Sequence, residues 1–477
     1  MKKKTFIISL ICSITLLLSI PLTVLGVGFL TPPQYDETYY GELPYLFNRL
    51  KKAKREKIIF VGNSALAFGV RRDILEKELL TDVNLFGLYG AIGTKAMMDL
   101  SKVNISKGDI VVLAPELNEQ GCSLYFSAEN LWMSIDGHYE MLNYVAKENK
   151  EKMVGTFAKF AADKLKYAIE GEKPSVEGVY MQSSFNDYGG KEIGYMTYFR
   201  DYNHLMNGYD SNNMIDFNTD LFDDEFVNYI NQYNKYVISK KAKLYVGFVP
   251  MNRMAVNVEE EQINDFYNFL EEKLDCPILG NPNSYIFDYE WFYDNNMHLN
   301  SDGTYIYNKT LTDDLKIAME NTSHTEIFIP NKPTVPVEPF EEGDNSDVGL
   351  FKYEEYSTGV RICGITEEGA QRKKITLPST YNDMQVMTFT KDVFKDNKNI
   401  SEIVIPANIR GLEDGAFDGC KNLTRIILCQ DNPNRIKVGM GLLDGAENCS
   451  IYVKENSYNA YITHYDWAYY RDVIIKY

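Results

Sequence analysis

Ser64 stands at a sharp change of pattern in the stretch KIIFVGNSALAFG, residues 57–69. The run 57–61 is apolar and rich in β-branched residues, which predicts a buried strand. A serine at the end of such a strand fits two roles. It is either the N-cap of an ordinary helix, or a nucleophile whose hydroxyl lies at the carboxyl edge of a parallel sheet, where open α/β sheets bind ligands. The tripeptide Gly-Asn-Ser does not separate the two.

A nucleophilic serine needs a base, and the chain has five histidines to supply one. His298 stands in WFYDNNMHLNSDG, residues 291–303, just before the last helical pattern of the same region. The loop before that helix opens at the same sheet edge as Ser64, so we expect the two side chains to meet. Asp294 precedes His298 by four residues and is expected to orient the imidazole, which completes a triad. The alternative is a loop histidine that caps the helix beginning near Asp302.

The elements that must position these residues alternate along the chain. Short apolar runs predict strands at 57–61, 83–86, 110–114, 242–250 and 276–280. Helical patterns fall at 73–80, 94–103, 259–274 and 302–320. This alternation predicts a parallel sheet with helices on both faces. Residues 119–225 lack clear strand signals and are expected to form a mostly helical insertion.

The N-terminus predicts a membrane anchor. Three lysines precede an uncharged, mostly apolar stretch from Thr5 to about Leu30. A secretory signal core has only about 7–15 residues, whereas a spanning helix needs about 20. We expect residues 1–30 to be an uncleaved single-pass anchor, with the lysines in the cytoplasm and the bulk of the chain outside the cell. Residues 31–56 are expected to be a stalk.

Charge and cysteine content exclude several classes of protein. The net charge of −18 argues against a nucleic-acid partner, because the phosphate backbone repels an acidic chain. The seven cysteines lack CxxC spacing, and no EF-hand spacing is present. We therefore expect no metal and no cofactor. Disulfides in an oxidising exterior and reduced cysteines both remain open.

A second region follows a proline-rich, acidic linker at 326–347. Residues 348–477 contain an internal repeat with a period of 23 residues, in which Ile403 aligns with Ile426 and Ile405 with Leu428. One short strand in each copy of this period is typical of leucine-rich repeats. A single copy cannot bury its apolar face, so we expect a stack of at least three.

Both regions resemble known families. The stretch IPANIRGLEDGAFDGCKNLTRIIL, residues 405–428, resembles the BspA-type leucine-rich repeats of bacterial surface proteins, in which Cys420 would be a core residue. Residues 57–325 resemble the SGNH (GDSL-like) hydrolases, in a variant branch associated with the bacterial envelope. That resemblance implies a flavodoxin-like three-layer α/β/α fold.

The SGNH resemblance also implies roles for residues of this chain. Ser64 matches the nucleophile, although Asn63 replaces the family's aspartate beside it. Gly87 matches the glycine that lends an N–H group to the oxyanion hole. The third block reads VVLAPELNEQ, residues 111–120, in place of Gly-x-Asn-Asp, so Glu116 and Asn118 are its polar candidates. Asp294 and His298 are one residue further apart than in the family's last block.

These observations predict an extracellular, membrane-anchored esterase or O-acyltransferase. The expected substrate is an acyl ester, most plausibly acetyl, of a cell-surface polysaccharide, and the repeats are expected to bind a protein or glycan. The alternative is a catalytically degenerate SGNH fold that serves as a binding scaffold. A hydrogen bond between Ser64 and His298 favours the enzyme, whereas a bond between Ser64 and Glu116 in its place favours the scaffold.

Overall fold

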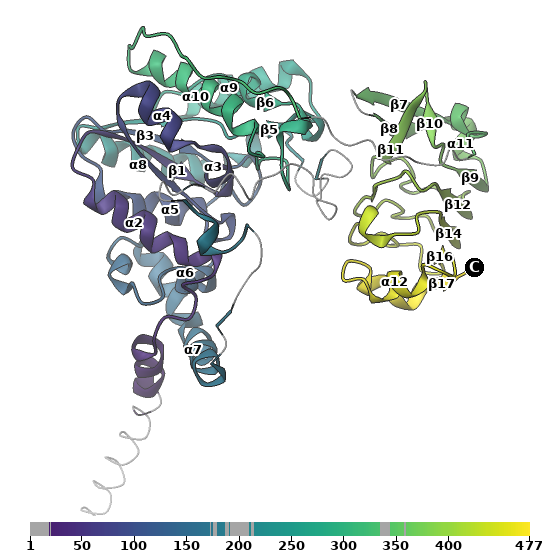
Figure 1. Ribbon diagram of the computed structural model, residues 1–477, viewed down its shortest axis with the longest axis horizontal. Coiled ribbons are helices and arrows are strands. Elements are labelled where there is room, and N and C mark those ends of the chain that lie inside the picture. Colours follow the sequence, from purple (N-terminus) through teal and green to yellow (C-terminus); the bar gives the residue numbers. More distant parts are fainter. Residues whose placement is uncertain are drawn as a thin grey trace, which may run out of the picture. The chain divides into compact units, whose positions relative to one another are not determined.

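The computed structural model describes residues 19, 21–171, 173–174, 179–186, 190, 209–210, 214–333, 344–356 and 359–477. The chain divides into two compact units (Figure 1). The first holds the described residues of Met1–Thr197, Ile215–Phe287 and Met297–Asn331. The second holds those of Tyr198–Met214, Asp288–Asn296 and Lys332–Tyr477. Residues 334–343 of the expected linker lie outside the described part of the chain.

The first unit is built on a four-stranded parallel sheet of order β2-β1-β3-β4. Its strands are β1 (Lys57–Gly62), β2 (Asp82–Gly87), β3 (Ile110–Ala114) and β4 (Lys243–Val246). Every residue of β1 is buried, because helices cover both faces of a parallel sheet. The strand expected at 242–250 is shorter than predicted, and the one expected at 276–280 forms only a bridge between Ile278 and Val246. Two short strands, β5 (Met251–Asn252) and β6 (Ile286–Phe287), pair separately.

The helices of the first unit follow the predicted alternation. They are α2 (Leu43–Lys52), α3 (Ser64–Gly69), α4 (Arg72–Leu79), α5 (Thr94–Ser101), α6 (Ala128–Ser134), α7 (Lys147–Glu170), α8 (Asp224–Ser239), α9 (Glu260–Lys273) and α10 (Gly303–Ala318). The connections β1–β2 and β2–β3 run in opposite directions across the sheet. Right-handed crossovers therefore place α4 and α5 on opposite faces. Helix α8 joins α5, because the Tyr233 hydroxyl lies 2.6 Å from Ser101 Oγ, whereas α10 packs on α3 and α4.

The segment expected to be a stalk is part of the first unit. Helix α2 lies within residues 31–56, and its apolar face, which includes Leu43, Phe47 and Leu50, is fully buried. The prediction was wrong because the apolar residues of this helix are spaced for one buried face, as in a core helix. Of the expected anchor, residues 1–18 and 20 lie outside the described residues. Among the helices that are described, none combines the length and the apolar character needed to cross a membrane.

The second unit is a stack of short parallel strands. Its five-stranded sheet has the order β17-β16-β14-β12-β9. The strands are β9 (Lys374–Thr376), β12 (Glu402–Ile405), β14 (Arg425–Leu428), β16 (Ser450–Val453) and β17 (Ile474–Lys476). Before this sheet, β7 (Phe351–Tyr356), β8 (Gly359–Ile365), β10 (Thr380–Tyr381) and β11 (Met384–Phe389) form a mixed sheet. Smaller elements are α11 (Glu367–Ala370), β13 (Gly411–Leu412), β15 (Lys437–Val438) and α12 (Tyr458–Thr463).

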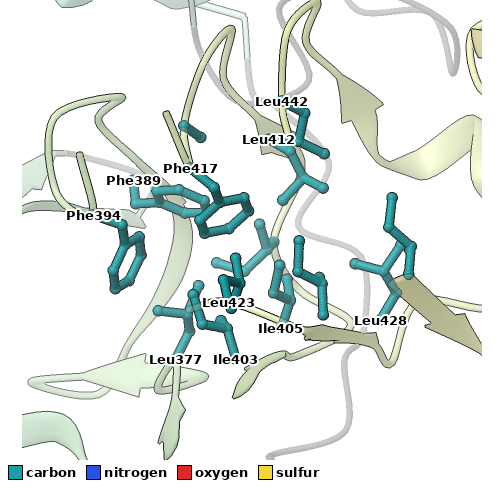
Figure 2. Close-up of a cluster of buried hydrophobic side chains, with 14 of the residues drawn as sticks. Leu377, Phe389, Phe394, Ile403, Ile405, Leu412, Phe417, Leu423, Leu428 and Leu442 are labelled. Carbon is teal, nitrogen blue, oxygen red and sulfur yellow. The ribbon is translucent and has the colours of Figure 1, made fainter. Parts of the chain in front are cut away.

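The register of this stack confirms the predicted repeat. Ile403 pairs with Ile426, and Ile405 with Leu428, as the period of 23 residues requires. Ile426 pairs in turn with Ile451 of β16, which adds a further strand to the stack. The isoleucines and leucines point into one core together with Phe389, Phe394 and Phe417 (Figure 2). One repeat thus buries its apolar face against the next.

The cysteines of the described residues are all unpaired: Cys122, Cys276, Cys363, Cys420, Cys429 and Cys449. Cys420 is buried in the repeat core, as expected, and its thiol donates to the Phe394 carbonyl at 2.9 Å.

Candidate active site

Three strands bring the predicted site residues to one edge of the first sheet. Gly62, the last residue of β1, pairs with Gly87 of β2 and with Ala114 of β3. Because parallel strands end at the same edge, the residues that follow them face a common space. Ser64 begins α3 two residues beyond β1. Glu116 follows β3 by two residues.

Close approach of α3 to the strands depends on the two glycines. A Cβ at Gly62 would lie 2.3 Å from the Ala114 carbonyl oxygen of β3 and 2.8 Å from Leu66 Cδ1 of α3, and one at Gly87 would lie 2.7 Å from Leu66 Cβ. All three distances are shorter than van der Waals contact, so a side chain at either position would displace the helix that carries Ser64. Gly87 therefore has a packing role in addition to the oxyanion role that the resemblance implies.

Ser64 and His298 lie within hydrogen-bonding distance. Ser64 Oγ is 2.8 Å from His298 Nε2, and the side chain of His298 is only 3% exposed. The imidazole stacks on Phe68 of α3 with a centroid separation of 3.9 Å and an angle of 1° between the rings. The phenyl ring thus restricts rotation of the imidazole.

Neither residue has the capping role that was the alternative. Asn63, not Ser64, occupies the N-cap position of α3, and no side-chain hydrogen bond caps that helix. At the start of α10 the Asn300 side chain accepts from the Gly303 N–H group at 2.9 Å. His298 is therefore not the residue that caps α10.

Helix α10 is fixed to α3, which carries the nucleophile. Asn308 of α10 donates from Nδ2 to the Gly69 carbonyl at 2.8 Å and accepts from the Arg71 N–H group at 2.9 Å. The Tyr307 hydroxyl donates to the Phe248 carbonyl at 3.1 Å. These bonds hold the two ends of the Ser64–His298 pair on one rigid support.

Glu116 also contacts the nucleophile. Its Oε1 atom accepts from Ser64 Oγ at 3.0 Å and from the Ala65 N–H group at 3.0 Å. The serine hydroxyl has one proton, so it donates either to His298 or to Glu116, and not to both. When the proton lies toward Glu116, His298 must itself donate from Nε2 to the serine oxygen. The Ser64–His298 contact, which favours an enzyme, and the Ser64–Glu116 contact, which favours a scaffold, are therefore both present.

A polar loop holds Glu116 in place. Asn118 Oδ1 accepts from the Gly121 N–H group at 2.7 Å, which closes a turn after Glu116. Thr94 Oγ1 lies 2.6 Å from the Gly121 carbonyl oxygen and 2.9 Å from Asn63 Oδ1. The Asn118 carbonyl group thus stabilises the loop, and Thr94, which sequence reasoning missed, joins this loop to Asn63.

Asn63 and Gly90 line the same space. Asn63 is 2% exposed, and within the described part of the chain its Nδ2 atom has no hydrogen-bond partner. A Cβ at Gly90 would lie 3.7 Å from Asn63 Nδ2 and 3.7 Å from Glu116 Oε2. A buried donor without a partner carries a desolvation penalty that a ligand atom would relieve. Gly90 was missed, although the cluster GLYGAIG marked a tight loop here.

Asp294 falls in Asp288–Asn296, a segment grouped with the second unit, whereas His298 is grouped with the first. Its role as the group that orients His298 therefore stays a prediction.

Cys122, on the same loop, is not a competing nucleophile. Burial raises the pKa of its thiol, and the charge of Glu116 adds to this effect. The thiol donates to the Glu116 carbonyl at 3.2 Å. No cluster of three or more His, Cys, Asp or Glu side chains suited to a metal occurs among the described residues.

Comparison with known proteins adds little to this geometry. Neither a protein-family model nor a curated protein gives a significant match to the chain. Among solved structures, the chain is similar to a leucine-rich repeat protein of T. pallidum, with 18% identity and a TM-score of 0.20. The match covers 24% of this chain and 49% of that one. The function of the site is therefore inferred from its residues.

Proposed function

We propose that this protein is a serine esterase or O-acyltransferase of the SGNH type, held outside the cell by its N-terminal anchor. One observation carries the proposal: the 2.8 Å separation between Ser64 Oγ and His298 Nε2 at the carboxyl edge of a parallel sheet. A serine within hydrogen-bonding reach of a buried, restrained imidazole is the arrangement of an activated nucleophile.

In the proposed reaction Ser64 Oγ attacks the carbonyl carbon of an acyl ester. His298 Nε2 accepts the serine proton and returns it to the oxygen of the departing alcohol. An acyl group then remains on Ser64. Water releases it as an acid, or a sugar hydroxyl takes it up as a new ester, with His298 again accepting the proton.

The oxyanion of this reaction needs hydrogen-bond donors to stabilise it, and the Glu116 carboxylate opposes that stabilisation. Two donors at the site are the Ala65 N–H group, which is bonded to Glu116, and Asn63 Nδ2, which has no partner among the described residues. A carboxylate in that position repels a developing negative charge. The reaction therefore requires the Glu116 side chain to withdraw or to take up a proton when substrate binds.

The same contact favours a second candidate, a scaffold without catalytic activity. If Glu116 holds the Ser64 proton permanently, the serine is not a nucleophile and the site is a remnant. The solvent-facing side of the repeats would then provide the main function, as a surface that binds a glycan or a protein.

Labelling with a fluorophosphonate distinguishes the two candidates. The full chain in membranes is treated with the probe, and the adduct is located by peptide mass. We expect labelling at Ser64, and loss of that labelling in Ser64→Ala and His298→Ala. The control Ser123→Ala, on the loop that holds Glu116, should label as the wild type does. Failure of the folded wild type to label would favour the scaffold.

Glu116→Gln tests the role of the carboxylate. The amide still accepts from the Ala65 N–H group but carries no charge. We expect labelling to accelerate about tenfold or more, which corresponds to roughly 1.4 kcal/mol of barrier. Slower labelling would instead place Glu116 among the groups that activate Ser64. The acyl group is then identified by incubating labelling-competent protein with acetylated envelope polysaccharides and measuring released or transferred acetate.

A further inference from the structure

An apolar hollow in the first unit lies far in the sequence from Ser64 and has no part in the proposed chemistry. It measures about 610 Å³ and is formed where helical residues 21–30 meet α6 and α7. Its walls include Val24, Leu25, Phe29, Trp132, Met153 and Phe157. Lys150 is the one charged side chain among the described residues that line it.

The helical residues 21–30 are clamped onto this unit. Lys164 of α7 is fully buried, and its Nζ donates to the carbonyl groups of Gly28 and Thr31 at 3.1 and 2.8 Å. The same Nζ pairs with Asp136 at 2.6 Å. A lysine that satisfies the last carbonyls of a helix also complements the helix dipole. This clamp fixes the direction in which residues 21–30 leave the unit.

The two helices also pack closely. A Cβ at Gly28 would lie 2.3 Å from the Phe157 ring, so this glycine allows the N-terminal helix to approach α7 (Figure 1). Phe29 makes ring contacts with Tyr139 at 4.7 Å and with Phe157 at 4.8 Å. The wall of the hollow is therefore rigid.

The hollow lies where the predicted anchor would leave a bilayer. The uncharged stretch from Thr5 to Leu30 has 26 residues, whereas a spanning helix needs about 20. If the span begins at Thr5, twenty residues end at Val24. Val24 and Leu25 both line the hollow. The residues after Val24 then connect the span to Gly28 and Thr31, whose carbonyl groups accept from Lys164.

Apolar side chains around the hollow are unusually exposed. Val154 of α7 and Leu25 of the N-terminal helix, both in its wall, are 74% and 44% exposed. Leu22, next to the lining residue Pro21, is 64% exposed. An exposed apolar patch of this kind marks a contact surface.

We propose that this hollow receives an acyl chain of a lipid in the outer leaflet of the membrane, beside the point where the predicted anchor would enter the bilayer. The occupant is lipid because the wall is continuous with the apolar stretch that the bilayer would surround. The lining is apolar apart from Lys150, whose ammonium suits a lipid phosphate at the rim. The inference rests on the anchoring in the proposed function and not on the chemistry of Ser64.

Trp132, in the wall of the hollow, provides the test. The full chain is placed in nanodiscs of phosphatidylglycerol and phosphatidylcholine, with or without bromine atoms on the acyl chains, because bromine quenches tryptophan emission on contact. The chain has three tryptophans, so Trp132→Phe isolates the signal of this one. We expect brominated lipid to remove at least half of the Trp132 emission.

A charge at the mouth of the hollow should abolish this effect. Val154→Asp should remove most of the quenching, whereas Ile317→Asp, at a residue 76% exposed on α10, should leave it unchanged. Equal emission in brominated and ordinary lipid, from chain shown to be in the discs, would overturn the proposal, as would quenching that persists in Trp132→Phe. Labelling of Ser64 is measured on the same discs, so failure of the lipid site and failure of the catalytic site are told apart.

Discussion

The four-stranded sheet of the first unit and the five-stranded sheet of the second are both parallel, but they bury their strands differently. All six residues of β1 are buried, because long helical connections cover both faces of its sheet. In β12 the residues alternate, with Ile403 and Ile405 in the core and their neighbours partly exposed. The outward side carries charge, since Glu402 pairs with Lys374 at 3.2 Å and with Arg425 at 3.3 Å.

This difference determines where each sheet offers polar groups. A sheet covered on both faces leaves only its ends for chemistry, and Ser64, Glu116 and His298 meet at such an end. A sheet covered on one face leaves a broad side of the stack for contact with other molecules. The first arrangement suits a small reacting group, and the second suits a large partner.

The largest effects should come from buried groups that have one specific partner. Lys57 at the start of β1 is 1% exposed, and its Nζ lies 2.7 Å from Asp109 Oδ2. Lys57→Met leaves the Asp109 carboxylate buried without its cation, so the first unit should lose about 3–5 kcal/mol of unfolding free energy. Urea unfolding followed by circular dichroism measures this. Lys54→Met, at an exposed position, should change it little.

Removal of an aromatic ring should destabilise the repeat stack by a similar amount. Phe417 is fully buried, and its ring centroid lies 5.7 Å from that of Phe394. Phe417→Ala should lower the unfolding free energy of the second unit by about 3–5 kcal/mol. Emission of the buried Trp467 reports this loss. Labelling of Ser64 should persist, and a loss of labelling would show that the two sheets do not act separately. Met440→Ala, at an exposed residue of the same unit, serves as control.

A smaller effect is expected from the polar loop. Thr94→Val keeps the volume but removes the hydroxyl that Asn63 and the Gly121 carbonyl share. The first unit should lose about 1–3 kcal/mol, and labelling of Ser64 should accelerate because the Glu116 carboxylate is less firmly held beside the serine. Thr94→Ser retains the hydroxyl and should label as the wild type does. Equal labelling by the valine and serine variants would argue against this role for Thr94.

The smallest expected effect is a change of melting temperature on substitution of two neighbouring aspartates of α10. The change should have opposite signs for Asp314 and Asp313. Burial raises the pKa of Asp314 above its usual 3.8, and nearby Asp313 adds to this, although Tyr285 donates to it. A raised pKa favours the protonated form in the folded state, so the contribution of Asp314 is present below about pH 3.8 and is lost as the pH rises above it. Asp314→Asn should therefore raise the melting temperature slightly at pH 7.

Asp313 is the matched control. Burial alone would raise its pKa, but the hydrogen bonds from Lys309 and Thr325, together with the charges of Lys309 and Lys316, outweigh burial and lower it. Its contribution is present at neutral pH and is lost as the pH falls below 3.8. Asp313→Asn should therefore lower the melting temperature at pH 7 and have no effect in acid. The same sign of change for both variants would contradict this account.

The sequence predicted those features that depend on periodicity and chain order. Ser64 and His298 were placed at one edge because parallel strands end together, and Ile403 was aligned with Ile426 because the repeat period matches the strand register. The prediction of a stalk at 31–56 was wrong because one buried face of α2, with residues such as Phe47, was overlooked. Thr94 and Gly90 were missed because their roles depend on loop conformation, which spacing does not specify.

The grouping of Asp288–Asn296 with the second unit was also beyond sequence reasoning. Asn296 donates from Nδ2 to the Asp210 carbonyl at 2.6 Å and accepts from the Asp210 N–H group at 2.8 Å. These residues are 86 positions apart, and neither stands in a repeat. Polar pairs of this kind leave no periodic signal in the sequence.

The clamp at Lys164 has a consequence for maturation of the protein. Proteases that process secreted chains act on extended backbone, whereas the carbonyl groups of Gly28 and Thr31 are bonded to a buried lysine. Cleavage next to them would require that part of the folded unit to open first. Folding of the first unit therefore protects the backbone around Gly28 and Thr31 from cleavage.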